Sequence, residues 1–260
     1  MDKTKQLGQH FLKDKKILEA MACAAELSKS DIVLEIGPGT GTLTEVLARY
    51  AKKVIAVEKD RDLIPALREK LKSCKNVEII EGDILKISDF QFPIFKQIKN
   101  YKIVANLPYY ITSRFLRLFL SETKFRTKLM VLMIQKEVAE RIMARGKHES
   151  LLSLSVKVYG KPEIIKIVPR GAFSPPPKVD SAIIKISNIS DKFFTENKMN
   201  PDKFFEILRL AFQKKRKMLR NSIFSKSDFK NPRSRTSEYF AARRPEELSL
   251  EDWAEIISNC

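Results

Sequence analysis

The fold is indicated most clearly by a stretch near the middle of the chain, Lys102-Ile103-Val104-Ala105-Asn106-Leu107-Pro108-Tyr109-Tyr110. Its first half is a short apolar run of the kind that forms a buried strand. Pro108 cannot donate to a sheet ladder and disfavours helix at the residue before it, so we expect the strand to end at Asn106. An amide, a fixed turn and an aromatic ring then follow the carboxyl end of a strand, where open α/β sheets bind ligands. In isolation the stretch is equally compatible with an ordinary proline turn.

A glycine-rich turn upstream favours the ligand-binding interpretation. The segment 32–36 reads as a strand, Gly37-Pro38-Gly39-Thr40-Gly41 follows it, and a helix is expected from Thr42. This turn lets the backbone approach a nucleotide-like ligand closely. Its spacing is Gly-x-Gly-x-Gly, whereas dinucleotide-binding dehydrogenases need Gly-x-Gly-x-x-Gly. Glu35 precedes the first glycine, where it can contact an amine or fix the turn.

Two further predicted strands end in acidic residues. Strand 54–57 leads to Glu58, 21 residues after Gly37, which is the spacing at which a carboxylate reaches ribose hydroxyls. Strand 77–80 leads to Asp83, which can accept a hydrogen bond from an adenine amine. Because predicted helices separate these strands, the sequence predicts a parallel, doubly wound α/β sheet.

The charge balance points to a polyanionic partner. The 260 residues include 49 Lys and Arg against 32 Asp and Glu, for a net charge of +17. Nucleic acid is the first candidate partner and an anionic membrane surface the second. Three isolated cysteines and two histidines give no credible metal site. No apolar run of membrane-spanning length and no signal-peptide pattern is present, so we expect a cytoplasmic, metal-free protein with no membrane association.

The second half of the chain has a different pattern. Segments 163–168 and 181–186 read as an antiparallel strand pair around Phe173, whereas 150–159 alternates with a strand-like period. Alternating strands disappear after about residue 188, which predicts a catalytic domain over 1–188 and a small helical domain over 189–260. A helix is expected from about 201 to 224. Its basic residues are expected to contact RNA phosphates; they are Lys214, Lys215, Arg216, Lys217 and Arg220.

The motifs together resemble a known enzyme family. Gly8 to Leu12, Glu35 to Gly41, Glu58, Gly82-Asp83 and Asn106 to Tyr109 look like class I S-adenosylmethionine-dependent methyltransferases, which have a Rossmann-like sheet. More narrowly, they resemble the rRNA adenine-N6 dimethyltransferases. Segments 129–141, 173–181 and 204–222 match in the right order, the last being similar to the branch that modifies small-subunit (16S) rRNA. The resemblance makes 150–159 helical, and we prefer it there to the periodicity.

The resemblance implies the cofactor and its contacts. S-adenosyl-L-methionine is expected to lie with its methionine part at Gly37 and Gly39, its ribose at Glu58 and its adenine at Asp83. Asn106 borders the sulfonium. The pocket is closed from the N-terminal side by Gln9, His10 and Leu12.

The resemblance also implies the reaction. The Asn106 side chain and the Leu107 carbonyl accept hydrogen bonds from the target N6 amine, Pro108 fixes the turn, and Tyr109 and Phe173 stack on the base. The expected substrate is a pair of adjacent adenosines in the 3′-terminal hairpin loop of small-subunit rRNA, dimethylated within a pre-ribosomal particle by a monomeric enzyme.

Other functions stay open at this point. One is a large-subunit rRNA adenine methyltransferase of the macrolide-resistance type, and another is a non-catalytic ribosome-assembly factor that keeps the fold as an RNA clamp. A DNA adenine methyltransferase is a poorer match because those more often carry proline at the position of Leu107. The charge disfavours a small-molecule methyltransferase.

Overall fold

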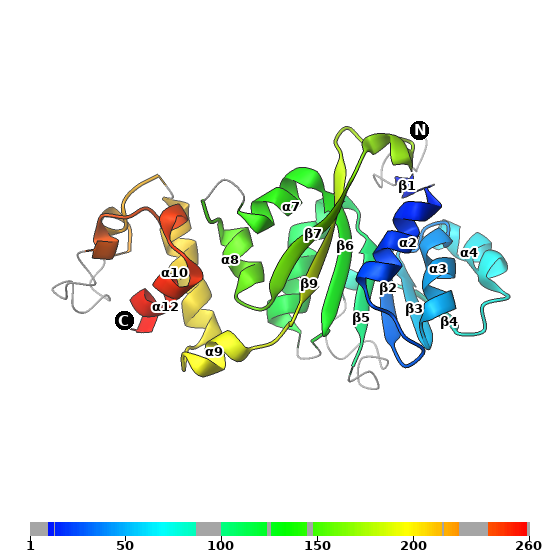
Figure 1. The fold of residues 1–260 in the computed structure, drawn as a ribbon, viewed down its shortest axis with the longest axis horizontal. Helices are drawn as coiled ribbons and strands as arrows, with labels where there is room; N and C mark the ends of the chain where they lie inside the picture. Colours follow the sequence, from blue (N-terminus) through cyan, green and yellow to red (C-terminus); the bar gives the residue numbers. More distant parts are fainter. Residues whose placement is uncertain are drawn as a thin grey trace. The chain divides into compact units, whose positions relative to one another are not determined.

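A computed structural model describes residues 10–12, 14–86, 100–123, 126–144, 148–214, 216–223 and 239–258. The chain divides into two compact units (Figure 1). The first unit comprises Met1–Ala139 and Lys161–Ile189, and the second comprises Glu140–Gly160 and Ser190–Cys260. The sequence predicted one boundary near residue 188. The structure divides the chain at Ile189 and also groups residues 140–160 with the C-terminal segment, although no change of composition marks that region.

The first unit is built on a seven-stranded sheet with the order β4-β3-β2-β5-β6-β9-β7. Its strands are β2 (Ile32–Ile36), β3 (Lys53–Glu58), β4 (Val77–Glu81), β5 (Lys102–Asn106), β6 (Leu129–Gln135), β7 (Lys161–Val168) and β9 (Ser181–Ser187). The strands from β4 to β6 are parallel, and β9 and β7 add an antiparallel pair. The predicted α/β sheet and the predicted antiparallel pair are confirmed.

Helices of the first unit follow the expected alternation. They are α2 (Lys15–Ala24), α3 (Thr42–Tyr50), α4 (Ile64–Leu71), α6 (Thr112–Arg117) and the start of α7 (Lys136–Met143). The amphipathic helices α2 and α3 bury residues such as Leu18 and Leu47 in one cluster with Val33 and Val104 of the central strands. Burial of each such side chain contributes roughly 1.5–3 kcal/mol. This packing holds the carboxyl ends of the parallel strands at one edge.

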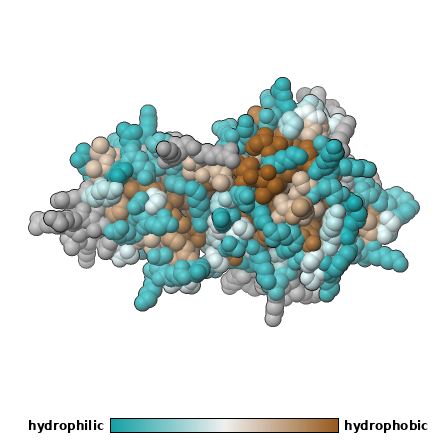
Figure 2. Space-filling view, viewed as in Figure 1, coloured by the Kyte–Doolittle hydropathy of each residue, from teal (hydrophilic) through white to brown (hydrophobic). Residues whose placement is uncertain are grey.

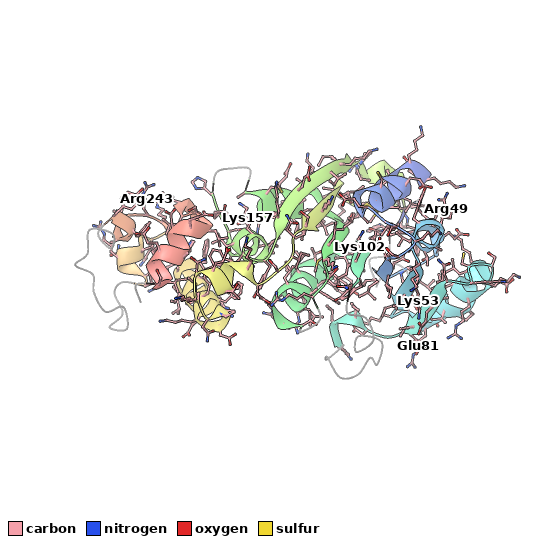
Figure 3. All side chains as sticks on the ribbon, turned by 60° about the horizontal axis from the view of Figure 1, so that its bottom comes forward. Arg49, Lys53, Glu81, Lys102, Lys157 and Arg243 are labelled. Carbon is pink, nitrogen blue, oxygen red and sulfur yellow. The ribbon has the colours of Figure 1, made fainter. Side chains whose placement is uncertain are left out.

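A two-stranded antiparallel pair joins distant parts of the chain. β1 (Phe11–Leu12) pairs with β8 (Phe173–Ser174), so that Phe11 lies opposite Ser174 and Leu12 opposite Phe173. Lys102 is the first residue of β5 in the seven-stranded sheet (Figure 3). Its ammonium group holds this strand end by donating to Asp31 at 3.2 Å and to the Glu26 carbonyl at 2.6 Å.

The second unit is helical in its described part. It contains the end of α7, α8 (Leu151–Lys157), α9 (Lys192–Glu196), α10 (Pro201–Gln213) and α12 (Leu250–Ser258). An aromatic cluster forms its core, with Phe194 and Phe204 5.4 Å apart between ring centroids and Tyr159 5.4 Å from Phe194. The helix that the resemblance predicted over 150–159 is confirmed by α8, which the Ser150–Ser153 capping box starts.

The predicted helix over 201–224 is wrong at its end. α10 starts at Pro201, after the Asn200 cap, and stops at Gln213. The longer helix was predicted because apolar spacing continues beyond Gln213. Cations follow at 214–217, however, and like charges at helical spacing destabilise a helix. A short 3₁₀ turn, Leu219–Asn221, follows separately.

The face in view in Figure 2 is mostly hydrophilic, with an apolar area where Figure 1 shows the sheet. Among the described residues, no helix is both long and apolar enough to cross a bilayer.

Candidate active site

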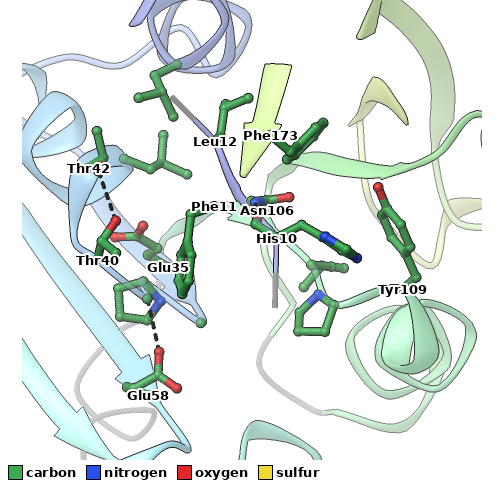
Figure 4. Close-up of a pocket in the computed structure, with 17 residues that line it drawn as sticks. His10, Phe11, Leu12, Glu35, Thr40, Thr42, Glu58, Asn106, Tyr109 and Phe173 are labelled. Atoms are coloured by element: carbon green, nitrogen blue, oxygen red, sulfur yellow. Dashed lines mark hydrogen bonds between the residues drawn. The ribbon is translucent and has the colours of Figure 1, made fainter. Parts of the chain in front are cut away.

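Side chains at the carboxyl ends of four parallel strands converge on two adjoining pockets. Gly37, Glu58, Asp83 and Asn106 follow or end β2, β3, β4 and β5. Gly37, Glu58 and Pro108 line both pockets. The first pocket (Figure 4) extends to the N-terminal segment and to Phe173, whereas the second extends to Asp83. The strand-end residues that the sequence singled out therefore share one edge of the sheet.

The glycine turn has the conformation that its sequence requires. Gly37, Gly39 and Gly41 have positive φ angles of 64°, 55° and 74°. Residues with a Cβ rarely adopt this region. A Cβ built on Gly39 would also lie 3.0 Å from the Phe11 ring. Without a Cβ, the turn lets the Phe11 ring lie directly against its backbone on the pocket side.

Glu58 links the turn to the next strand. It is 5% exposed, and its carboxylate accepts hydrogen bonds from the Gly39 amide at 3.0 Å and from the Asp60 amide at 2.8 Å. Each oxygen retains a further lone pair, so the group can also accept from a ligand diol.

Asp83 has both oxygens engaged in the second pocket. Lys59 forms an ion pair with it at 3.0 Å, and the Leu85 amide donates to it at 3.0 Å. Burial raises the pKa of Asp83, but the contacts with Lys59 and Leu85 outweigh burial and hold that pKa below its usual value. Asp83 therefore stays an ionised acceptor near neutral pH, as contact with an adenine amine would require.

Glu35 is buried at the other end of the site. It is 1% exposed, and its Oε2 atom has no hydrogen-bond partner among the described residues. Burial raises the pKa of Glu35 to about 8, with the Thr44 hydroxyl opposing the rise and the Glu58 carboxylate adding to it. An unpartnered acidic group at a pocket is a candidate contact for a ligand cation.

Asn106 has its amide oriented by the N-terminal segment. Its Nδ2 donates to the His10 carbonyl at 3.4 Å, and among the described residues no hydrogen bond is made to its Oδ1. The Leu107 amide donates to the Met133 carbonyl at 3.2 Å, while its side chain is buried at 1% exposure. Pro108 then turns the chain into the 3₁₀ turn Tyr109–Ile111. The acceptor end of the amide is thus available to the pocket.

Two aromatic side chains border the same pocket. Tyr109 donates or accepts a 2.7 Å hydrogen bond with the Ser181 hydroxyl, and burial raises its pKa, so the phenol stays neutral. Phe173 is 5% exposed and is placed by the β1–β8 pair. The His10 ring stacks at 6.0 Å from Tyr109, and its Nδ1 lies 2.8 Å from the Pro175 carbonyl.

The structure brings together nearly all the predicted pocket residues. His10, Leu12, Glu35, Gly37, Gly39, Glu58, Asn106, Leu107, Pro108, Tyr109 and Phe173 line the first pocket, and Asp83 lines the second. Gln9 lies outside the described residues.

Several residues of the site were not anticipated from the sequence. Phe11 reaches into the first pocket beside the glycine turn (Figure 4), Lys59 pairs with Asp83, and Ser181 anchors Tyr109. Phe11 lies between the predicted His10 and Leu12, so its position was a usable signal. Lys59 follows Glu58 directly, whereas nothing in the sequence connects Ser181 to Tyr109.

The predicted RNA-contacting residues form an exposed basic run in the second unit. Lys214, Arg216, Lys217 and Arg220 are exposed, and none of them forms an ion pair with a described residue. Lys215 is outside the described residues. Their availability is compatible with phosphate contact.

The two pockets fit a nucleoside that carries an amino-acid tail. Asp83 offers an acceptor for a base amine, Glu58 an acceptor for a diol, and the glycine turn a close backbone approach. The unpartnered Oε2 of Glu35 offers an acceptor for an ammonium group. These features match the parts of S-adenosyl-L-methionine. The described residues contain no cluster of three or more His, Cys, Asp and Glu side chains that could hold a metal ion.

Comparison with known proteins gives the same result at the level of the whole chain. A family model for ribosomal RNA adenine dimethylases matches residues 1–257. A protein of Dehalococcoides mccartyi strain CBDB1 named ribosomal RNA small subunit methyltransferase A is 46% identical over 97% of this chain and 86% of its own length. A protein of that name from Clostridium botulinum strain Loch Maree is 42% identical over 98% of this chain and 93% of its own length.

Solved structures show the same fold. A dimethyladenosine transferase from Plasmodium falciparum has a TM-score of 0.78 and 31% identity, covering 95% of this chain and 96% of that one. The 23S rRNA methyltransferase ErmE has a TM-score of 0.77 and 26% identity, and the match covers 96% of this chain and 98% of that one. The predicted fold class and family are confirmed. This chain belongs to the ribosomal RNA adenine dimethylase family.

Proposed function

We propose that this chain dimethylates the N6 amines of two adjacent adenosines in the 3′-terminal hairpin loop of small-subunit rRNA, with S-adenosyl-L-methionine as the methyl donor. The observation that carries the chemistry is the orientation of Asn106, whose Nδ2 is engaged by the His10 carbonyl while Oδ1 is left for the substrate. The small-subunit target rests on the relatives of 39–46% identity, which carry that name.

The side chains of the site position a weak nucleophile. The N6 lone pair of adenine is delocalised into the ring, so the amine must be held with that lone pair directed at the methyl group. Asn106 Oδ1 and the Leu107 carbonyl accept hydrogen bonds from the two N–H groups of the amine. These contacts position the nitrogen for attack. They also stabilise the positive charge that develops on it during transfer. The bound cofactor supplies a methyl group on a positively charged sulfur. No strong base is required, because the proton can leave after transfer.

The target base has to leave its stack to reach this pocket. In this proposal Tyr109 and Phe173, which line the first pocket, contact the faces of the base, and each stacking contact contributes roughly 1–3 kcal/mol. The Ser181 hydrogen bond fixes the tyrosine ring without using its face. A nitrogen that has accepted one methyl group and released one proton retains one N–H and a lone pair, so one of the two acceptors can still hold it for a second transfer.

We further propose that the enzyme works as a monomer in the cytoplasm on a pre-ribosomal particle. The exposed basic residues Lys214, Arg216, Lys217 and Arg220 support contact with the RNA backbone. In this proposal the first unit performs catalysis and the second unit binds the RNA backbone.

A transfer assay tests the reaction and the target together. The protein is incubated with isotope-labelled S-adenosyl-L-methionine and, separately, immature small subunits, large subunits and duplex DNA, and the labelled nucleoside is identified by mass. We expect N6,N6-dimethyladenosine only from the small subunits. Asn106→Ala is expected to lose at least 100-fold in rate. Asn197→Ala, at an exposed asparagine that lines neither pocket, is the matched control and retains the rate.

Two outcomes distinguish the other functions. Label in large-subunit RNA favours the activity named for ErmE, whose structure is also similar to this chain. Salt-sensitive binding to the small subunit without methyl transfer favours a non-catalytic assembly factor.

A further inference from the structure

We infer that binding of the methionine end of the cofactor removes a proton from Glu35, so that cofactor affinity is linked to pH through this one buried carboxyl group. The inference rests on the proposed function, because it takes the ligand to be S-adenosyl-L-methionine or its demethylated product. It goes beyond that function by assigning a proton stoichiometry to cofactor binding.

Burial is the first step of the argument. Glu35 is 1% exposed in the strand β2, and its Oε2 atom has no hydrogen-bond partner among the described residues. An isolated carboxylate in such a place is strongly disfavoured, and a buried acid without a counter-ion takes up a proton instead.

The neighbouring groups give no compensating charge. β3 places the Glu58 carboxylate nearby, α3 contributes the Thr44 hydroxyl, and α2 contributes the apolar Leu18. The other titratable groups in the described lining of the pocket are His10 and Tyr109, and that lining includes no lysine or arginine. Burial raises the pKa of Glu35 to about 8, which agrees with a protonated group at neutral pH.

The position of Glu35 in the first pocket indicates that the ammonium group of the ligand is its partner. Glu35 lines the first pocket beside Gly37 and Gly39, whereas Asp83 lines the second pocket. With the adenine at Asp83 and the ribose at Glu58, the amino-acid tail extends toward the Glu35 end. An ammonium group there stabilises the carboxylate, so binding converts a neutral acid into one member of an ion pair and releases its proton to solvent.

Calorimetry of S-adenosyl-L-homocysteine binding tests this inference with the whole protein. The product analogue keeps the ammonium group and does not react. Titrations at pH 7 in buffers of different ionisation enthalpy give the number of protons released, and we expect close to one. Affinity should rise about tenfold per pH unit up to about pH 8 and then level off. 5′-Methylthioadenosine, which has the nucleoside but no amino acid, should bind without proton release and with an affinity independent of pH.

The variant Glu35→Gln assigns the proton. It keeps the shape of the side chain but cannot ionise, so proton release and the pH dependence should both disappear while binding of 5′-methylthioadenosine is retained. If the wild-type protein binds S-adenosyl-L-homocysteine with no proton release, or if Glu35→Gln still releases a proton, the inference is wrong although the proposed function stands. If neither ligand binds the wild-type protein at any pH, the cofactor assignment itself fails.

Discussion

At the scale of single residues, Glu35 should make the stability of the cofactor-free protein depend on pH. Its pKa is raised to about 8 in the folded protein from 4.5. The folded state therefore holds a proton that the unfolded state loses, and this stabilisation is complete below about pH 4.5 and is lost as the pH rises to about 8. The limiting slope for one such group is about 1.4 kcal/mol of unfolding free energy per pH unit.

Urea unfolding between pH 5 and pH 8 checks this expectation. The unfolding free energy of wild type should fall relative to that of Glu35→Gln as the pH rises, because the glutamine has no proton to lose. Glu69→Gln, at an exposed carboxylate on α4, is the control and should follow the wild-type profile. Parallel profiles for wild type and Glu35→Gln would show that the buried acid does not titrate in this range.

At the scale of elements, the turn between β2 and α3 should tolerate no Cβ at Gly39. Gly39→Ala places an L side chain at φ +55° and 3.0 Å from the Phe11 ring, so either the turn or Phe11 must shift. Left-handed backbone alone costs roughly 1–2 kcal/mol, and we expect binding of S-adenosyl-L-homocysteine to weaken about tenfold or more.

A second glycine provides the comparison. Gly171 lies near the start of the loop after β7, and a Cβ there would meet no atom within 4 Å. Gly171→Ala should therefore bind the product analogue like wild type, as measured by the same titration. Equal affinities for Gly39→Ala and wild type would contradict the close approach that we assign to this turn.

The main strands and their order could be predicted from the sequence, whereas the shortest strands could not. The strands 32–36, 54–57, 77–80 and 103–105 could be predicted because buried apolar runs are bounded by charges, glycine or proline, and their order placed Glu58, Asp83 and Asn106 at one edge. β1 and β8 have two residues each, too few for any periodicity to appear.

Contacts between distant side chains could not be predicted either. The hydrogen bond between Tyr109 and Ser181 and the packing of Phe11 on Gly39 depend on how loops are placed by the folded sheet. The end of α10 at Gln213 was missed because apolar spacing continued, although the cations that follow at helical spacing disfavour a longer helix. The role of the domains and the contacts of the basic run stay predictions.

At the scale of the whole molecule, the net charge of +17 should appear as a steep salt dependence of RNA binding. Each phosphate contact that is lost reduces the slope of log K against log salt by roughly 0.7–0.9. Replacing the exposed residues Lys214, Arg216, Lys217 and Arg220 with glutamine should therefore flatten the slope by up to about 3 in a titration with small-subunit RNA.

A charge-matched variant separates location from total charge. Glutamine at the exposed positions Lys52, Arg68, Lys72 and Lys75 removes the same four charges from the first unit, away from both pockets. We expect a smaller change in slope. Equal changes for the two variants would mean that RNA responds to net charge alone and that the basic run has no special place in binding.

The reversed direction of β9 has a consequence for how such an enzyme can diversify. Because β9 runs antiparallel to β6, the loop between β7 and β9 emerges at the same edge as the glycine turn, yet it comes from a separate part of the chain. Insertions or exchanges in 169–180 can therefore change the Phe173 side of the first pocket without altering the strands β2 to β5. The pairing of Phe173 with Leu12 is the junction that such a changed loop has to preserve.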